Sequence, residues 1–113
     1  MEARLPTHLE VAALIRRTES LGGFATVLQR GERESGTIMI VLRERGTEDR
    51  IYERMPNLDG SRPWHCSRQQ TENNREEFDL YIKRRGEQDP DLWILELDIA
   101  EGERLIGLTT PIG

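Results

Sequence analysis

Hydrophobic residues near the N-terminus recur with the period of an α-helix, about 100° per residue. The segment from Thr7 to Glu10 fits a capping box. In this motif the Thr7 hydroxyl accepts a hydrogen bond from the Glu10 amide, and the Glu10 carboxylate accepts one from the Thr7 amide. We therefore predict a helix that begins at Thr7 and ends at Gly22-Gly23, because glycine favours the left-handed exit of a helix. Its apolar face consists of Val11, Leu14, Ile15, Thr18 and Leu21.

Two apolar segments follow, Phe24 to Arg30 and Thr37 to Arg43, and a polar connection from Gly31 to Gly36 separates them. This arrangement is typical of an antiparallel hairpin with a six-residue loop. The second segment is apolar on both sides, which predicts a central place in the sheet. The segment from Arg50 to Met55 is less regular, and we expect an edge strand there.

The C-terminal half begins with a turn-rich segment, Pro56 to Pro63, after which Trp64 to Ser67 is expected to form a short strand. A second helix is predicted from about Glu72 to Arg85, with Asn73 or Thr71 as its cap and Gly86 as its end. Phe78, Tyr81 and Ile82 form its apolar stripe.

A proline turn at Asp89-Pro90 leads into a strand from Leu92 to Asp98, on which Trp93, Leu95 and Leu97 share one face. After Ile99, a last hairpin at Glu101-Gly102 is favoured over a helical turn from Ala100 to Ile106. The order of elements predicts a single α+β domain over residues 1–113, with a mostly antiparallel sheet of about four to five strands and two helices on one face.

Composition limits the classes of function. The net charge of −5 argues against non-specific binding of nucleic acid, which depends on clustered cations. The single cysteine, Cys66, excludes an internal disulfide and favours a reducing compartment. The N-terminus lacks the apolar core of a signal peptide, and no segment approaches the roughly 20 apolar residues of a membrane span. We expect a cytoplasmic protein with no membrane association.

Several short motifs are distributed along the chain: Gly22-Gly23-Phe24-Ala25, Arg30-Gly31, Ser35-Gly36, Tyr81 to Arg85 and, above all, Asp89 to Glu96. In these motifs the chain resembles a family of small alphaproteobacterial proteins known as domain of unknown function 1491. The resemblance extends over nearly the whole chain and implies a bacterial, cytoplasmic, single-domain protein. It implies no activity, substrate or catalytic residue.

Acidic residues flank the last predicted strand, and carboxylates at one end of a strand can hold Mg²⁺ and position a water. Asp89 and Asp91, however, are separated from Glu96 and Asp98 by roughly 15–20 Å of extended chain. We therefore interpret the first two as turn residues and the last two as a solvated or arginine-paired face. A metal-assisted hydrolase that uses Glu96 and Asp98 remains the alternative.

Other candidate chemistry is weaker. His65 and Cys66 are adjacent, so their side chains point to opposite faces of a strand, and His8 is distant in sequence. We expect no metal, no cofactor and no cysteine nucleophile. Arginines on the first three predicted strands could contact RNA, but interleaved glutamates argue for ordinary ion pairs, and nucleic-acid binding is the third hypothesis. These arginines are Arg30, Arg33, Arg43, Arg45, Arg50 and Arg54.

The two tryptophans are expected to differ in role. Trp93 lies in an alternating strand and is predicted to be in the core, whereas Trp64 follows a polar loop and is a candidate contact residue. We predict a binding surface in this region, formed by Asp59, Arg62, Trp64 and His65. The sequence thus favours a small non-enzymatic binding or adaptor domain that binds an unknown protein partner or forms a homodimer through a sheet edge.

Overall fold

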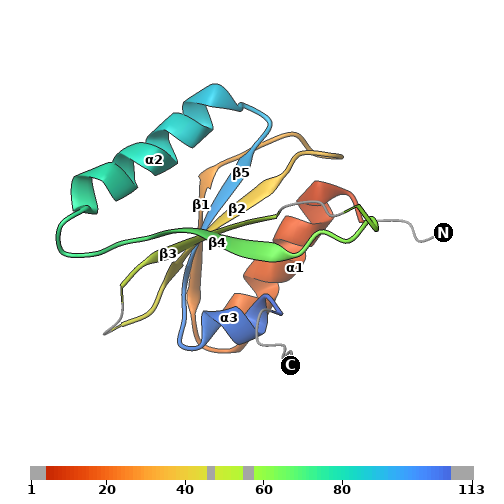
Figure 1. The fold of residues 1–113 in the computed structure, drawn as a ribbon. Helices are drawn as coiled ribbons and strands as arrows, with labels where there is room; N and C mark the ends of the chain where they lie inside the picture. The colour runs from red at the N-terminus through yellow and green to blue at the C-terminus, as the bar shows by residue number, and fades with distance from the viewer. Residues whose placement is uncertain (1–4, 46–47, 55–57, 108–113) are drawn as a thin grey trace.

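Five strands form one sheet in the order β1-β5-β2-β3-β4, accompanied by three helices (Figure 1). The computed structural model describes residues 5–45, 48–54 and 58–107. Together these elements form one α+β domain, as predicted. In chain order they are α1 (Thr7–Ser20), β1 (Phe24–Gln29), β2 (Ile38–Arg43), β3 (Arg50–Arg54), β4 (Trp64–Gln69), α2 (Arg75–Gln88), β5 (Trp93–Asp98) and α3 (Gly102–Leu105).

β1 and β2 do not form the predicted hairpin, because β5 lies between them. β5 runs antiparallel to β1 and parallel to β2. Its first half, from Trp93 to Leu95, is apolar on both faces, and a place inside the sheet buries both sides of that half. The connection from β1 to β2 crosses the start of β5, where Gly31 and Gly36 lie so close to the Asp91 carbonyl that a Cβ at either position would overlap it.

The edges of the sheet are β1 and β4, so the prediction that the third strand is an edge was wrong. β3 pairs antiparallel with both β2 and β4. It has two neighbours because the expected short strand at Trp64 is a full strand of six residues. β2 is central, as predicted, and its residues from Ile38 to Leu42 are all buried.

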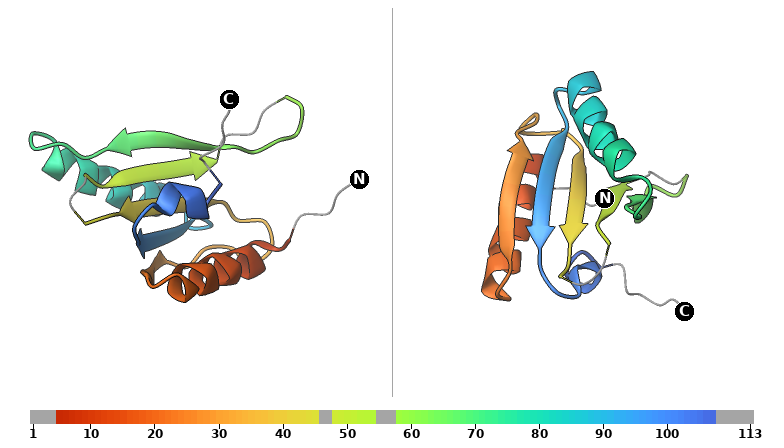
Figure 2. Two further views of the ribbon diagram at one scale, coloured as in Figure 1. Left: turned by 90° about the horizontal axis from the view of Figure 1, so that it is seen from below. Right: turned by 90° about the vertical axis from the view of Figure 1, so that its left-hand side faces the viewer.

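The helices cover both faces of the sheet, whereas the sequence predicted one covered face (Figure 2). Alternate residues of β2 point to opposite faces of the sheet. Ile40 packs in a cluster with Val11 of α1, and Val41 packs in a cluster with Phe78 of α2. The two central strands are apolar on both sides, and each side therefore needs a helix to exclude water. Trp93 is in the core as predicted, with 3% of its surface exposed.

The N-terminus of α1 is held by the β1–β2 connection rather than by the predicted capping box. The Thr7 hydroxyl donates to the carbonyl of Gly36 at 2.7 Å, and the Thr7 amide donates to the carbonyl of Glu34 at 3.1 Å. The Glu10 carboxylate turns to Arg54 instead. At the other end, Gly22 has a φ of +90°, the expected left-handed exit, but Leu21 is exposed because it follows the last helical turn.

α2 begins three residues later than predicted and continues through Gly86 to Gln88. Asn73 and Thr71 precede it, and the Asn74 carboxamide accepts from the Thr71 amide rather than from a helix amide. Gly86 lies where α2 approaches Gln29 and Ile94, so this glycine permits close packing and does not end the helix. The predicted stripe is confirmed, since Phe78 is buried and Tyr81 and Ile82 pack beside it.

The segment after β5 forms the short helix α3, not the favoured hairpin. A left-handed Glu101, with φ of 56°, turns the chain into it. Leu105 and Ile106 then join the cluster on the α1 side of the sheet. These two adjacent residues are both apolar and both buried. A helical turn can bury two adjacent side chains, whereas an edge strand would point one of them to the opposite face of the sheet. The rest of the ambiguous tail, after Gly107, lies outside the described residues.

Candidate functional site

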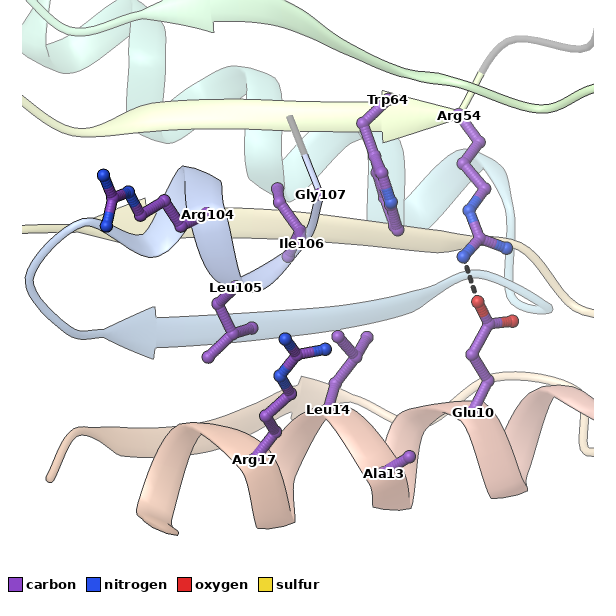
Figure 3. Close-up of a pocket in the computed structure, with 10 residues that line it drawn as sticks. All are labelled: Glu10, Ala13, Leu14, Arg17, Arg54, Trp64, Arg104, Leu105, Ile106 and Gly107. Atoms are coloured by element: carbon purple, nitrogen blue, oxygen red, sulfur yellow. Dashed lines mark hydrogen bonds and ion pairs between the residues drawn. The ribbon is translucent and has the colours of Figure 1, made fainter. Parts of the chain in front are cut away.

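Two of the four predicted binding residues lie beside the same ion pair, and two do not. Trp64 begins β4 and points toward α1 and α3, while Arg62 borders an adjoining depression with Glu10 and Arg54 (Figure 3). His65 is exposed on β4. Asp59 is exposed as well, and its carboxylate accepts from the Ser61 amide at 2.9 Å and from the Ser61 hydroxyl at 2.7 Å.

Asp59 therefore closes a local turn. Two hydrogen bonds from Ser61 lower the pKa of Asp59 below its usual value, and the bond from the Ser61 amide has a larger effect than the bond from its hydroxyl. A carboxylate that is satisfied by its own loop is a structural feature of that loop. The candidate site therefore centres on Trp64, toward the α1 side of the sheet.

A pocket of about 280 Å³ lies between α1, α3 and the adjacent ends of β3 and β4 (Figure 3). Its apolar surface comes from Leu14, Leu105, Ile106 and the Trp64 ring. Four charged side chains surround this surface, three of them arginines. The complete lining is Glu10, Ala13, Leu14, Arg17, Arg54, Trp64, Arg104, Leu105, Ile106 and Gly107.

Arg54 fixes one wall of the pocket. Its guanidinium forms an ion pair with Glu10 of α1 and lies 4.5 Å above the centre of the Trp64 ring. Both charged side chains are largely shielded from water, with 15% and 24% of their surfaces exposed, which strengthens the pair relative to a surface one. The contact with the ring is a cation–π interaction that restricts the orientation of Trp64.

The other two arginines are less constrained. Arg104 pairs with Glu101 at 3.3 Å, but both side chains are mostly exposed, so the pair contributes little to stability. Arg17 projects from α1 into the space between Leu14 and Leu105 (Figure 3). Within the described residues, its guanidinium has no carboxylate within ion-pair distance. Three guanidiniums and one carboxylate make the pocket cationic on a chain whose net charge is −5.

The acidic residues around β5 are divided between its two ends. Asp89 accepts from the Asp91 amide at 3.1 Å and so closes the turn before the strand, as interpreted from the sequence. Glu96 pairs with Arg43, which also contacts Asp49 at 3.5 Å. In the part of the chain that the structure describes, no three His, Cys, Asp or Glu side chains are arranged to hold a metal ion.

Two polar clusters under the helices were not predicted. Glu53 accepts hydrogen bonds from Tyr81, Ser67 and Arg85, which join α2 to β3 and β4. Burial opposes the ionisation of Glu53, but these bonds outweigh it and lower its pKa below the usual value.

The second cluster joins α3 to the sheet through Glu103, which accepts from both Tyr52 and Arg50. Burial and the bond to this carboxylate raise the pKa of Tyr52. Arg50, Arg43 and Arg54 of the proposed RNA-binding surface are thus all paired with carboxylates. Ion pairing was expected, but these three partners, Glu96, Glu103 and Glu10, come from other elements; Arg50 also contacts Glu44, one of the interleaved glutamates.

The chain thus forms one small α+β domain with a pocket beside its sheet. The chain belongs to the family described as "Protein of unknown function (DUF1491)", whose model matches residues 5–107, and the resemblance noted in the sequence is confirmed. In the described parts of the chain, no helix has the length and apolar character needed to cross a membrane.

Solved structures of relatives have the same fold. A DUF1491 family protein from Caulobacter crescentus CB15 is 33% identical, with a TM-score of 0.79, over 97% of this chain and 100% of that one. Protein Atu0922 from A. tumefaciens is 28% identical, with a TM-score of 0.78, over 98% and 100% of the two chains. Comparison with functionally curated proteins gives no match.

Proposed function

We propose that this protein is a non-enzymatic binding domain and that the pocket between α1 and α3 takes a small apolar ligand with one carboxylate group. The observation that carries the proposal is Arg17, a guanidinium without an ion-pair partner among the described residues, beside an apolar surface. A carboxylate matches the paired N–H groups of a guanidinium, and such charge-assisted bonds are stronger than neutral ones.

The other lining residues determine which non-carboxylate part of a ligand the pocket favours. Leu105 and Ile106 are already buried, so the hydrocarbon body of a ligand would remove surface from water mainly at Leu14 and the Trp64 ring, which are half-buried. Trp64 offers a ring face whose orientation Arg54 restricts, and this favours an aromatic group. The volume of about 280 Å³ is near the lower limit for ligand pockets and suits a single-ring carboxylate.

The charged lining supports binding more than catalysis. Among the described residues that line the pocket, Glu10 is the one carboxylate, and it is already paired with Arg54. The same described lining contains no serine, cysteine, histidine or lysine that a neighbouring base could activate. We place this binding in the bacterial cytoplasm, because the two relatives with solved structures come from C. crescentus and A. tumefaciens and the lone Cys66 is free and exposed.

Titration calorimetry with 3-phenylpropionate tests the proposal, with 3-phenylpropanamide as the uncharged control. We expect binding of the carboxylate with a dissociation constant on the order of 1 mM, as for a ligand of few atoms. Arg17→Gln should weaken it by about tenfold or more, because a charge-assisted hydrogen bond is lost. The matched control is Arg16→Gln, which removes an adjacent, exposed arginine that does not line the pocket.

Two results would contradict the proposal. One is equal affinity for the carboxylate and the amide, which would mean that no guanidinium recognises the charge. The other is an equal loss of affinity in Arg16→Gln and Arg17→Gln, which would show a diffuse effect of net charge and not a contact in the pocket.

A further inference from the structure

We propose that two copies of this chain associate through β1, the strand at one edge of the sheet. The two β1 strands would run antiparallel about a two-fold axis at Thr26 and join the two sheets into one. This surface is separate from the pocket, because none of the residues from Phe24 to Gln29 lines it. The inference therefore does not depend on the proposed function.

The first observation is the apolar character of β1. Phe24 is 73% exposed, and Val27 and Leu28 are also exposed. The strand has the sequence Phe-Ala-Thr-Val-Leu-Gln and contains no charged residue, although charged residues make up 33% of the chain. Edge strands of monomeric proteins are usually protected from further pairing by charges or proline. β1 has neither of these, and its protection is limited to the bulge between Val27 and Gln29.

The second observation is that the strand is complementary to itself. An antiparallel pair centred on Thr26 places Phe24 of one copy opposite Leu28, the bulged residue of β1, in the other, and the two-fold axis repeats this contact. On the other face of the strand, Ala25 lies opposite Val27. Aromatic–aliphatic pairs of this kind stabilise neighbouring strands. A second copy would therefore cover the exposed apolar side chains of β1 with apolar side chains of its own β1.

The opposite edge of the sheet provides a comparison within the same chain. β4 carries the polar residues His65, Arg68 and Gln69, which favour solvent over a dry strand pair. β1 has an irregularity between Val27 and Gln29, so the regular part of the shared ladder is short. We therefore expect a weak dimer with a dissociation constant on the order of 10–100 μM, as small interfaces give.

Cysteine cross-linking tests the predicted register. In a Cys66→Ser background, Thr26→Cys places two thiols directly opposite across the axis, at the roughly 4.5–5.5 Å Cα separation that a disulfide accepts. Mild oxidation should give a covalent dimer. The unmodified chain supplies the control, because Cys66 is exposed on β4. Cross-linking of Cys66 without cross-linking of Thr26→Cys would overturn the proposal and indicate pairing through β4.

Sedimentation equilibrium measures the association without a cross-link. Thr26→Lys places two like charges opposite each other and should weaken the dimer by about tenfold or more, whereas His65→Lys on β4 should leave it unchanged. If Thr26→Lys does not fold, Phe24→Ser removes the exposed aromatic contact instead and should have the same effect. A chain that remains monomeric at about 1 mM, or equal weakening by the β1 and β4 variants, would refute the proposal.

Discussion

Phe78 is the residue through which α2 packs most deeply on the sheet, and its removal tests the packing of that face. The side chain is 2% exposed and lies in a cluster with Met39, Val41, Ile51, Leu92 and Ile94. Phe78→Ala removes the ring and leaves a cavity, because the β-sheet below it cannot collapse into the space. The expected cost is about 3–5 kcal/mol of a total stability of roughly 5–15 kcal/mol.

For a domain of this length, that loss lowers the thermal midpoint by roughly 15 °C. Thermal and urea unfolding followed by circular dichroism would measure it. Leu80→Ala is the matched control on the same helix, because Leu80 is 46% exposed, and we expect a loss below about 1 kcal/mol. Equal losses in the two variants would refute the assignment of Phe78 as the anchor of α2.

Two further predictions concern Glu53 and Gly36. The pKa of Glu53 is lowered in the folded protein, so its contribution to stability is present above its ordinary pKa and is lost as the pH falls through the folded pKa. Glu53→Gln should therefore be less stable than the parent by about 2 kcal/mol at pH 7, and this difference should shrink below about pH 4. Urea titrations at several pH values measure it. A difference in stability that does not change with pH would contradict the prediction. Gly36→Ala should cost about 2 kcal/mol or more, because its methyl group would overlap the carbonyl of Asp91, and an unchanged urea midpoint would contradict the crossing of the loop over β5.

The elements of the fold were largely predictable, but the order of the strands was not. Local periodicity determines whether a segment is a helix or a strand, and the segments at Thr7, Thr37, Phe78 and Trp93 were all assigned to the correct type. Neighbouring strands in a sequence usually pair, which favoured a β1–β2 hairpin. The contrary signal was the first half of β5, from Trp93 to Leu95, which is apolar on both faces as expected of a strand inside a sheet.

The candidate site was only partly predictable. Trp64 was identified because an aromatic residue after a polar loop is unusual, and the structure places it against the pocket. Arg17 was assigned to the solvent face of its helix and is exposed there, but its place at the pocket was not foreseen, and Leu105 was assigned to an ambiguous tail. Arg17 and Leu105 line the same pocket because α3 packs against the α1 side of the sheet. No local sequence pattern specifies that packing.

The central claim is that an apolar carboxylate binds beside Trp64, and two-dimensional ¹H–¹⁵N NMR tests it most directly. The two indole N–H groups provide separate signals, one at the pocket and one in the core, where the Trp93 indole donates to the carbonyl of Glu32 at 2.8 Å. Addition of 3-phenylpropionate should shift the Trp64 signal progressively and leave the Trp93 signal in place. An unmoved Trp64 signal at about 10 mM ligand would contradict the account.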